Sequence, residues 1–352
     1  MITKKRIRVG IACSSDVFDL YFALDDLEEL RIFADVEWAE FDVGGDRWTI
    51  PPGNKMAERK LCDFASDLDA MILCHGAPRV TKAVFGAAPN LKLVGDIEGD
   101  RFAGRVDVSA ATKVGALVVD TSHASSWPVS EWALALMLMG LRRHGQYRAI
   151  IEGQDMSDRE YRQNPPGREL ARKTVGLIGF GHIAWHLCEL LTPFETPVVA
   201  YDPYVPRELA DAMNIDFASL NRAMVNDIVV CLAPCTPRTI GMIGREQLEL
   251  LKHDAVFVNV SRGAVVDTKA LTERAERGDI WCGLDVHDPE PIPVDSPLRN
   301  LSNVFLSPHI GGLTTEAQPR FFGLMVEELR RWVDGIEPHA QLTDRVLNGR
   351  MA

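Results

Sequence analysis

The 352-residue chain has no excess of positive charge, because 38 Lys and Arg stand against 50 Asp and Glu, for a formal net charge of −12. Nucleic-acid phosphates require a basic surface, so this balance argues against a nucleic-acid partner. An acidic protein that binds an anionic substrate must instead concentrate positive charge locally. Any site for an acidic substrate therefore depends on a few individual cationic side chains.

Long hydrophobic runs are also lacking. The longest apolar stretch, Trp132–Met139, is far shorter than the roughly 20 residues that span a bilayer. The N-terminus leads into Ile7–Ala12, which has the pattern of a short strand and not that of a signal peptide. We therefore expect a cytoplasmic protein with no membrane partner.

Cysteine is scarce and scattered, with seven residues and no Cys-x-x-Cys pair. An odd number without paired spacing predicts neither a disulfide framework nor a zinc site, and we expect no metal. Cys231 and Cys235 flank the end of an expected strand, where we interpret them as small buried hydrophobic residues.

The hydrophobic content of 46% and the length suit a globular protein of two domains. Short apolar strands alternate with helical or loop segments such as Asp16–Leu30 and Met56–Ser66, which is typical of a parallel sheet. The first strands are expected at Arg6–Cys13, Asp35–Phe41, Ala70–Leu73, Leu91–Gly95 and Leu117–Val119. A second series, which suits a Rossmann sheet, comprises Thr174–Gly179, Pro197–Asp202, Asp227–Leu232, Ala255–Val260, Trp281–Asp285 and Asn303–Ser307.

A domain junction is expected between these two series. The segment Val129–His144 has the pattern of a helix, and Gly153–Arg168 that of a polar loop. The stretch Thr315–Gly335 is expected to form a further amphipathic helix, with apolar residues at 321, 322, 325, 326, 329, 332 and 333.

A glycine-rich turn follows the first strand of the second series and opens a helix. In Gly179-x-Gly181-x-x-Ala184, Gly179 permits the tight turn and Gly181 lets the backbone approach a pyrophosphate. Asp202 ends the next strand, where a carboxylate can accept the ribose hydroxyls and would repel a 2′-phosphate. The turn alone is weak evidence, but with Asp202 in place it favours NAD over NADP.

Three polar residues each follow a strand of the same expected sheet. Arg262 can hold a carboxylate in a two-pronged hydrogen bond, although an isolated arginine is more often a surface ion-pair residue. His309 can protonate a carbonyl oxygen, and Glu290 on a proline-flanked loop can favour the charged imidazole. Either of these two alone is usually a polar loop group, whereas the ordered set of three indicates reduction of a 2-keto acid.

These motifs resemble the signature stretches of the D-isomer-specific 2-hydroxyacid dehydrogenases, whose members reduce glyoxylate, hydroxypyruvate and related 2-keto acids. The similarity covers nearly the whole chain and is carried by Asn259–Asp267, Leu284–Pro291, Ser307–Gly312 and the cofactor-lining loop Pro234–Thr239. It implies an α/β fold of two doubly wound domains, in which a Rossmann NAD-binding domain is inserted into a flavodoxin-like substrate domain. Residues 1–125 and 315–352 would form the substrate domain and residues 126–314 the NAD-binding domain of a homodimer.

The resemblance also assigns roles to individual residues. Arg262, Glu290 and His309 would be the catalytic trio, with His309 as acid and base. The substrate, a small 2-keto or 2-hydroxy acid, would be bound by Arg262 together with His75, Gly76 and Ala77. The cofactor NAD would be bound by Gly179, Gly181, His182, Ile183, Asp202, Ala233, Pro234, Thr239, Val260, Ser261, Asp285 and Gly311.

One stretch departs from the family pattern. The family usually reads Ala-Gly-x-Gly-x-Asp-Asn-Ile-Asp where this chain has the segment Gly95–Asp107, two residues longer. Its acidic residues would disfavour a phosphorylated substrate unless its two arginines point inward and neutralise them. We therefore expect hydroxypyruvate or glyoxylate over 3-phosphohydroxypyruvate or branched-chain acids. The charged residues in question are Asp96, Glu98, Asp100, Arg101 and Arg105.

Two other functions fit parts of the pattern. The same fold serves as an NAD-sensing co-repressor scaffold, but the acidic sequence offers no evident interaction arm. A formate dehydrogenase is disfavoured, because those enzymes carry a glutamine where this chain has Glu290. Turnover of any small 2-keto acid separates an enzyme from the scaffold.

Overall fold

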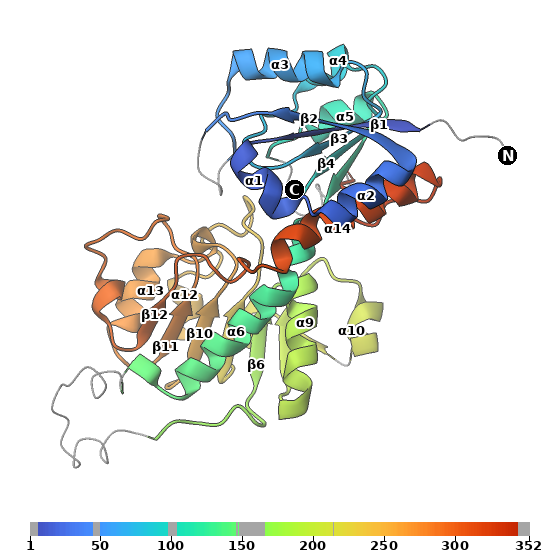
Figure 1. Ribbon diagram of the computed structural model, residues 1–352. Coiled ribbons are helices and arrows are strands. Elements are labelled where there is room, and N and C mark those ends of the chain that lie inside the picture. The colour runs from blue at the N-terminus through green and yellow to red at the C-terminus, as the bar shows by residue number, and fades with distance from the viewer. Residues whose placement is uncertain are drawn as a thin grey trace. The chain divides into compact units, whose positions relative to one another are not determined.

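The computed structural model describes residues 6–44, 50–97, 104–145, 147, 166–213 and 215–343. These form two compact units (Figure 1), of which one comprises the described residues up to Ser125 and from Thr314 onward, and the other Ser126–Leu313. The second unit is thus inserted into the chain of the first, as the family resemblance implies. Within those ranges, no helix has the length and apolar character needed to cross a membrane.

The first unit, formed by both ends of the chain, contains a five-stranded parallel sheet in the order β2-β1-β3-β4-β5. This order is that of the flavodoxin-like doubly wound fold, so the predicted fold class of this unit is confirmed. The strands are β1 (Ile7–Cys13), β2 (Ala34–Glu40), β3 (Ala70–Leu73), β4 (Leu93–Asp96) and β5 (Leu117–Asp120).

Helices cover both faces of this sheet (Figure 1). Alternate residues of β1 enter opposite cores: Val9 and Ile11 pack with the helices of one face, and Ala12 with those of the other. The first face carries α1 (Ser15–Tyr21), α2 (Leu24–Phe33) and α14 (Ala317–Val333). The second carries α3 (Lys55–Ala65), α4 (Lys82–Ala87) and α5 (Val108–Lys113).

The segment Asp16–Leu30, expected to be helical or a loop, contains most of α1 and the start of α2, with Phe22 and Ala23 between them. Phe22 has non-helical backbone angles and is buried. Its ring packs on that of Phe322 from α14, with centroids 4.7 Å apart. This contact joins residues 300 positions apart, so no local pattern in the sequence indicates it.

The inserted unit contains a seven-stranded parallel sheet in the order β12-β11-β10-β9-β6-β7-β8. Read from β6, this is the Rossmann order with one strand added at an edge. The strands are β6 (Val175–Ile178), β7 (Val198–Tyr201), β8 (Asp216–Phe217), β9 (Ile228–Cys231), β10 (Val256–Asn259), β11 (Trp281–Leu284) and β12 (Val304–Leu306). Only the two-residue strand β8 was not expected from the sequence.

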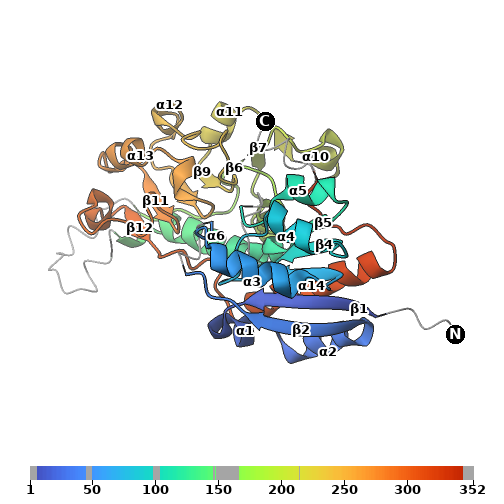
Figure 2. The ribbon, with the colours of Figure 1, turned by 90° about the horizontal axis from the view of Figure 1, so that it is seen from above.

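Helices again cover both faces of this second sheet, as Figure 2 shows from above. One face packs against α6 (Ser126–Leu141) and α9 (His182–Leu191), and α10 (Arg207–Met213) follows β7. The other face packs against α11 (Leu220–Met224), α12 (Arg245–Glu249) and α13 (Thr268–Ala275). Short 3-10 turns complete the elements at η1 (Ser122–Ser125), η2 (Thr192–Phe194), η3 (Gly263–Val265) and η4 (Pro297–Asn300). Most of the predicted polar loop Gly153–Arg168 lies outside the described residues.

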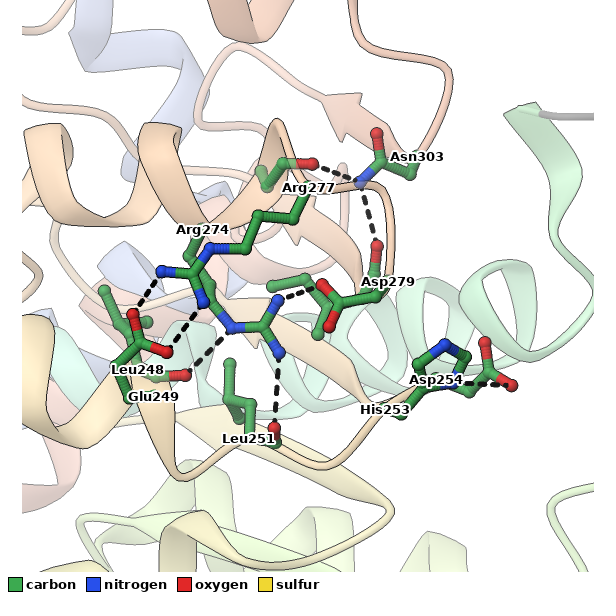
Figure 3. Close-up of polar contacts among 11 residues, drawn as sticks. Leu248, Glu249, Leu251, His253, Asp254, Arg274, Arg277, Asp279 and Asn303 are labelled. Carbon is green, nitrogen blue, oxygen red and sulfur yellow. Dashed lines mark hydrogen bonds and ion pairs between the residues drawn. The ribbon is translucent and has the colours of Figure 1, made fainter.

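The buried side chain of Arg274 joins several elements at the edge of this sheet where the strands begin (Figure 3). The guanidinium of Arg274 on α13 is 4% exposed, and it donates to the carbonyl oxygens of Leu248 (3.2 Å) and Leu251 (3.3 Å). It also pairs with Asp279, which lies just before β11. These contacts join α12, α13 and the sheet at the edge opposite the ends where doubly wound folds place their ligands.

Candidate active site

The glycine-rich turn connects β6 to α9. Gly179 has φ +94°, and a side chain there would place its Cβ 2.7 Å from the backbone nitrogen of Ala233. Only glycine fits this close approach between two loops. The cap residue of α9 is Gly181, which has no side chain to bond the first N–H groups, and His182 and Ile183 begin the helix. The first turn therefore directs backbone N–H groups and a positive dipole toward the region where phosphates bind.

Asp202 follows β7 and is fixed by backbone donors on both of its carboxylate oxygens. Phe180, inside the glycine-rich turn, donates its N–H to Oδ2 at 2.9 Å, and Tyr204 donates its N–H to Oδ1 at 2.9 Å. Each oxygen retains a lone pair that can accept a ribose hydroxyl. A negative charge is thus held beside the turn, in the arrangement that dinucleotide-binding folds use for NAD.

The loop after β9 contains Ala233, Pro234 and Thr239. Hydrogen bonds from side chains within this loop stabilise its conformation. The hydroxyl of Thr239 donates to the carbonyl of Pro234 at 2.5 Å and accepts the N–H of Thr236 at 2.8 Å. Because β9 is the direct neighbour of β6, this loop stands beside the glycine-rich turn. The predicted cofactor residues of three loops are thus brought to one edge of the sheet.

Arg262 lies just past β10, in an exposed position at the same edge of the sheet. Asn259 supports this segment, because its side chain donates to the carbonyl of Arg262 at 3.1 Å and accepts the N–H of Ser261 at 3.1 Å. Val260 is buried beneath them. The guanidinium donates to the carbonyl of Ser261 at 2.7 Å and makes no ion pair with any residue that the structure describes. It can therefore receive a carboxylate without first breaking an ion pair with those residues.

The loop that carries Arg262 packs backbone to backbone on the loop that carries Glu290. A Cβ on Gly263 would lie 2.0 Å from both the carbonyl carbon and the carbonyl oxygen of His287. Only a residue without a side chain allows this contact. Gly263 thus determines the spacing between two segments that hold predicted catalytic residues.

Glu290 and His309 form the closest polar pair of the predicted trio. Nδ1 of His309 lies 2.8 Å from Oε1 of Glu290, and the two side chains are 12% and 24% exposed. A carboxylate at this distance can accept a hydrogen bond from Nδ1–H, which fixes the orientation of the ring. Nε2 lies on the opposite side of the imidazole from this pair.

The backbone of His309 adopts a left-handed conformation with φ +57°, which few residues other than glycine adopt. Asp285, at the end of β11, holds it there through three backbone hydrogen bonds. Its carbonyl accepts the N–H of His309 at 2.8 Å, and its carboxylate accepts those of Ile310 at 3.0 Å and Gly311 at 2.9 Å. These bonds offset the cost of the strained backbone, which is on the order of 1–3 kcal/mol.

The carboxylate of Asp285 also has two side-chain partners and is itself only 2% exposed. Ser307 donates its hydroxyl to Oδ1 at 2.5 Å, and the indole Nε1 of Trp132 on α6 donates to the same oxygen at 3.2 Å. Asp285 was predicted to contact the cofactor, and that contact stays a prediction. The structure gives it a second role, as the residue that positions the histidine loop.

Cys231, one of the two cysteines expected to flank a strand end, is buried at the end of β9 with its Sγ 3.4 Å from the hydroxyl of Ser261. Burial raises the pKa of the Cys231 thiol to about 11, so it remains neutral near pH 7. The interpretation of this residue as a small buried group is confirmed.

The predicted substrate residues His75, Gly76 and Ala77 belong to the other unit, in the loop after β3. His75 is 8% exposed, and its ring meets that of Tyr21 edge to face with centroids 5.9 Å apart. Gly76 has φ +84°, and a Cβ there would lie 2.3 Å from the carbonyl oxygen of Phe41. Because the His75 ring and Ala77 are buried, we expect backbone groups of this loop, more than the imidazole, to meet a substrate.

The unusual segment after β4 contains a buried ion pair. Nη1 of Arg105 lies 3.0 Å from Oδ1 of Asp96, and the two side chains are 7% and 5% exposed. One of the three acidic residues is therefore neutralised inside the protein by one of the two arginines. The other charged residues of this segment, Glu98, Asp100 and Arg101, lie outside the described residues.

Residues 134–311 match the model of the D-isomer-specific 2-hydroxyacid dehydrogenase NAD-binding domain, which is half of the chain. The chain belongs to this family. Its cofactor is accordingly NAD, and the glycine-rich turn, the uncapped helix α9 and the fixed carboxylate of Asp202 fit that dinucleotide. The predicted family membership and cofactor are thus confirmed.

This chain is similar to individual members of the family with different names. It is 33% identical over 296 residues to a D-3-phosphoglycerate dehydrogenase of Methanocaldococcus jannaschii, covering 83% of this chain and 54% of the relative. It is 28% identical over 331 residues to a glyoxylate reductase of Korarchaeum cryptofilum, covering 94% and 97%. The structure of a glyoxylate reductase from Paecilomyes thermophila superimposes with a TM-score of 0.74 at 23% identity, covering 97% and 100%. The chain spans about half the length of the phosphoglycerate dehydrogenases it matches.

Three supporting residues were missed by sequence reasoning. Trp132 precedes Asp285 by 153 positions, so no local pattern connects them. Ser307 lies within the quoted histidine motif, but its bond to Asp285 depends on the pairing of β11 with β12. Gly263 also lies within a quoted motif, and its contact with His287 follows only from the packing of two loops.

Proposed function

We propose that this dehydrogenase reduces a small, unphosphorylated 2-keto acid to the corresponding D-2-hydroxy acid, with NADH as reductant and His309 as the acid. The observation that supports this most strongly is the 2.8 Å pair of His309 and Glu290, held at the sheet edge where Arg262 also lies. In the reverse direction His309 would act as the base. The homodimer that the family resemblance implies stays a prediction, which light scattering tests.

Arg262 would bind and orient the keto acid. Its guanidinium makes no ion pair with the described residues and has the planar donor geometry that matches a carboxylate. A second donor from the same group would polarise the neighbouring carbonyl oxygen, which becomes more negative as the reaction proceeds. Arg262 would therefore contribute both to substrate affinity and to the rate of the chemical step.

Glu290 and His309 would supply and hold the proton. The carboxylate of Glu290 would accept a hydrogen bond from Nδ1 and orient the ring, so that Nε2 is the nitrogen that would carry the transferred proton. That proton passes to the carbonyl oxygen as the carbonyl carbon is reduced, which leaves the hydroxyl group of the product and a neutral imidazole. Solvent then returns a proton to the imidazole.

The cofactor would be held by the glycine-rich turn, the start of α9 and Asp202. Gly179 and Gly181 allow the backbone to approach the pyrophosphate, and the carboxylate of Asp202 would accept the ribose hydroxyls. When bound, NADH supplies the hydride that adds to the carbonyl carbon. Asp202 disfavours NADPH because its charge would meet the 2′-phosphate.

The Asp96–Arg105 pair supports the choice of an unphosphorylated substrate. A phosphate group needs cationic partners, and Arg105 is buried and committed to Asp96 at 3.0 Å. We therefore propose hydroxypyruvate or glyoxylate in preference to 3-phosphohydroxypyruvate. Hydroxypyruvate carries a hydroxyl that can donate to an acidic segment, which a branched apolar tail cannot do.

The test is a comparison of kcat/KM with NADH for glyoxylate, hydroxypyruvate and 3-phosphohydroxypyruvate. The proposal predicts turnover of at least one of the first two, at a higher kcat/KM than that of the phosphorylated acid. A higher value for the phosphorylated acid would contradict the proposed substrate class. Tight NADH binding without turnover of any 2-keto acid would instead favour the co-repressor type of scaffold.

A further inference from the structure

Arg238 is a cation beside the expected cofactor site that has no acidic partner among the described residues. It is exposed at the tip of the loop after β9, between Thr236 and Thr239, whose hydroxyls lie 3.0 Å apart. Its Nη1 donates to the phenol oxygen of Tyr204 at 3.2 Å, and it makes no ion pair within the described ranges. By contrast, the nearby exposed Arg222 is paired with Asp216.

Tyr204 connects this guanidinium to the carboxylate that would recognise the ribose. Its backbone N–H donates to Oδ1 of Asp202 at 2.9 Å, and its ring reaches Arg238. Since β9 and β7 flank β6 in the sheet, the two loops stand on either side of the glycine-rich turn. The side chains of Asp202 and Arg238 form no ion pair with one another. The carboxylate of Asp202 and the guanidinium of Arg238 are therefore opposite charges that are not paired with each other. Both lie at the end of the site where the adenosine of the cofactor is expected.

We propose that Arg238 is a latent binding residue for the 2′-phosphate of NADP(H), and that Asp202 alone prevents its use. The inference rests on the proposed placement of the ribose at Asp202. A 2′-phosphate would meet both the carboxylate and the guanidinium. We expect the carboxylate to dominate, because it is half-buried and fixed by two backbone donors, whereas the exposed guanidinium is screened by solvent.

The proposal predicts that the two substitutions are not additive. Asp202→Ser removes the repulsion and lets Arg238 pair with the phosphate, so NADPH should bind about tenfold to a hundredfold more tightly. Adding Arg238→Gln to that variant should weaken NADPH binding about fivefold or more. When Asp202 is present, Arg238→Gln should change the ratio of the dissociation constants for NADH and NADPH by less than about twofold.

The experiment is a calorimetric titration of NADH and NADPH, without substrate, into the wild type, the two single variants and the double variant. Arg222→Gln, alone and combined with Asp202→Ser, is the matched control for loss of a surface charge. Asp202→Asn, which keeps an acceptor oxygen for one of the two N–H groups of Phe180 and Tyr204, repeats the series if Asp202→Ser folds poorly. Higher ionic strength should reduce the contribution of Arg238.

In the Asp202→Ser background, the proposal is overturned if Arg238→Gln leaves the affinity for NADPH unchanged. It is also overturned if Arg222→Gln weakens NADPH binding as much as Arg238→Gln does. Because binding is measured without a keto acid, this result does not depend on whether the proposed reduction occurs. A wild type that binds NADPH as tightly as NADH would instead show that the placement of the ribose at Asp202 is wrong. A wrong role for Arg238 and a wrong placement of the ribose therefore give different results in these titrations.

Discussion

The backbone N–H of His309 donates a 2.8 Å hydrogen bond to the carbonyl oxygen of Asp285. The carboxylate of the same aspartate binds the next two backbone N–H groups, at Ile310 and Gly311. One buried residue at the end of β11 thus holds the left-handed turn that presents the imidazole to Glu290. The position of the proposed acid depends on a residue that need not touch the substrate.

This relationship predicts the effect of Asp285→Asn. An amide has one acceptor oxygen, so its NH2 group would face one of the donors that the carboxylate now accepts. We expect kcat to fall about tenfold to a hundredfold, as for the loss of other residues that orient a catalytic group. Steady-state kinetics with hydroxypyruvate and NADH would measure this.

Trp132→Phe is the matched control, because it removes one 3.2 Å donor to the same carboxylate and leaves the backbone bonds in place. Its effect on kcat should be several-fold smaller than that of Asp285→Asn. An Asp285→Asn enzyme with the kcat of the wild type would show that the turn keeps its conformation without this carboxylate.

The close approach at Gly263 gives a second prediction. In Gly263→Ala the new methyl group would collide with the backbone of His287, so the loops of Arg262 and Glu290 must separate. We expect unfolding to become easier by about 1–3 kcal/mol, with a large loss of kcat/KM. Urea unfolding and steady-state kinetics together measure both effects.

Gly86→Ala provides the comparison, because Gly86 lies in α4 and a Cβ there meets no atom within 4 Å. Alanine in a helix is favoured over glycine by roughly 0.5–1 kcal/mol, so this variant should keep or gain stability. If Gly263→Ala also keeps its stability and its kcat/KM, the contact between the two loops does not determine the geometry of the site.

Glu290→Gln tests whether the charge beside His309 contributes to the rate. The amide oxygen can still accept a hydrogen bond from Nδ1, but it places no negative charge 2.8 Å from the imidazole. We expect kcat with hydroxypyruvate and NADH to fall about tenfold to a hundredfold, as for the loss of other residues that support a catalytic group. A Glu290→Gln enzyme with the kcat of the wild type would show that this charge is not needed.

Arg274 gives a prediction for stability without a change in chemistry. Arg274→Met would leave Asp279 and two carbonyl groups without their buried donor (Figure 3) and should destabilise the protein by about 3–5 kcal/mol. Arg277→Gln breaks only the exposed pair with Glu249 and should change the free energy of unfolding far less. Urea unfolding tests both, and kcat at a temperature where each variant is folded should stay near that of the wild type.

Much of the fold follows from local patterns in the sequence. Buried parallel strands are short continuous apolar runs, so eleven of the twelve strands could be expected from the sequence, and only β8 (Asp216–Phe217) lacked such a run. Helix α6 begins at Ser126, three residues before the predicted start, because Pro128 is tolerated in the first turn of a helix. The contact of Phe22 with Phe322 could not be expected, because it joins residues 300 positions apart.

Less of the candidate site than of the fold could be predicted from the sequence. Motif spacing indicates that Arg262, Glu290 and His309 follow strands of one sheet, since parallel strands bring their carboxyl ends to one edge. It does not reveal that Asp285 binds the histidine turn or that Arg105 is buried against Asp96, because both contacts depend on side-chain directions. Positions that only support a catalytic group carry no signal in sequence spacing.

The most direct measurement is the rate of NADH oxidation with hydroxypyruvate by the wild type and by His309→Ala, with NADH binding measured on both. If His309 is the acid, turnover should fall by about 100-fold or more while the dissociation constant for NADH stays within about threefold. Near-normal turnover by His309→Ala would contradict the proposed mechanism, whatever the identity of the preferred keto acid.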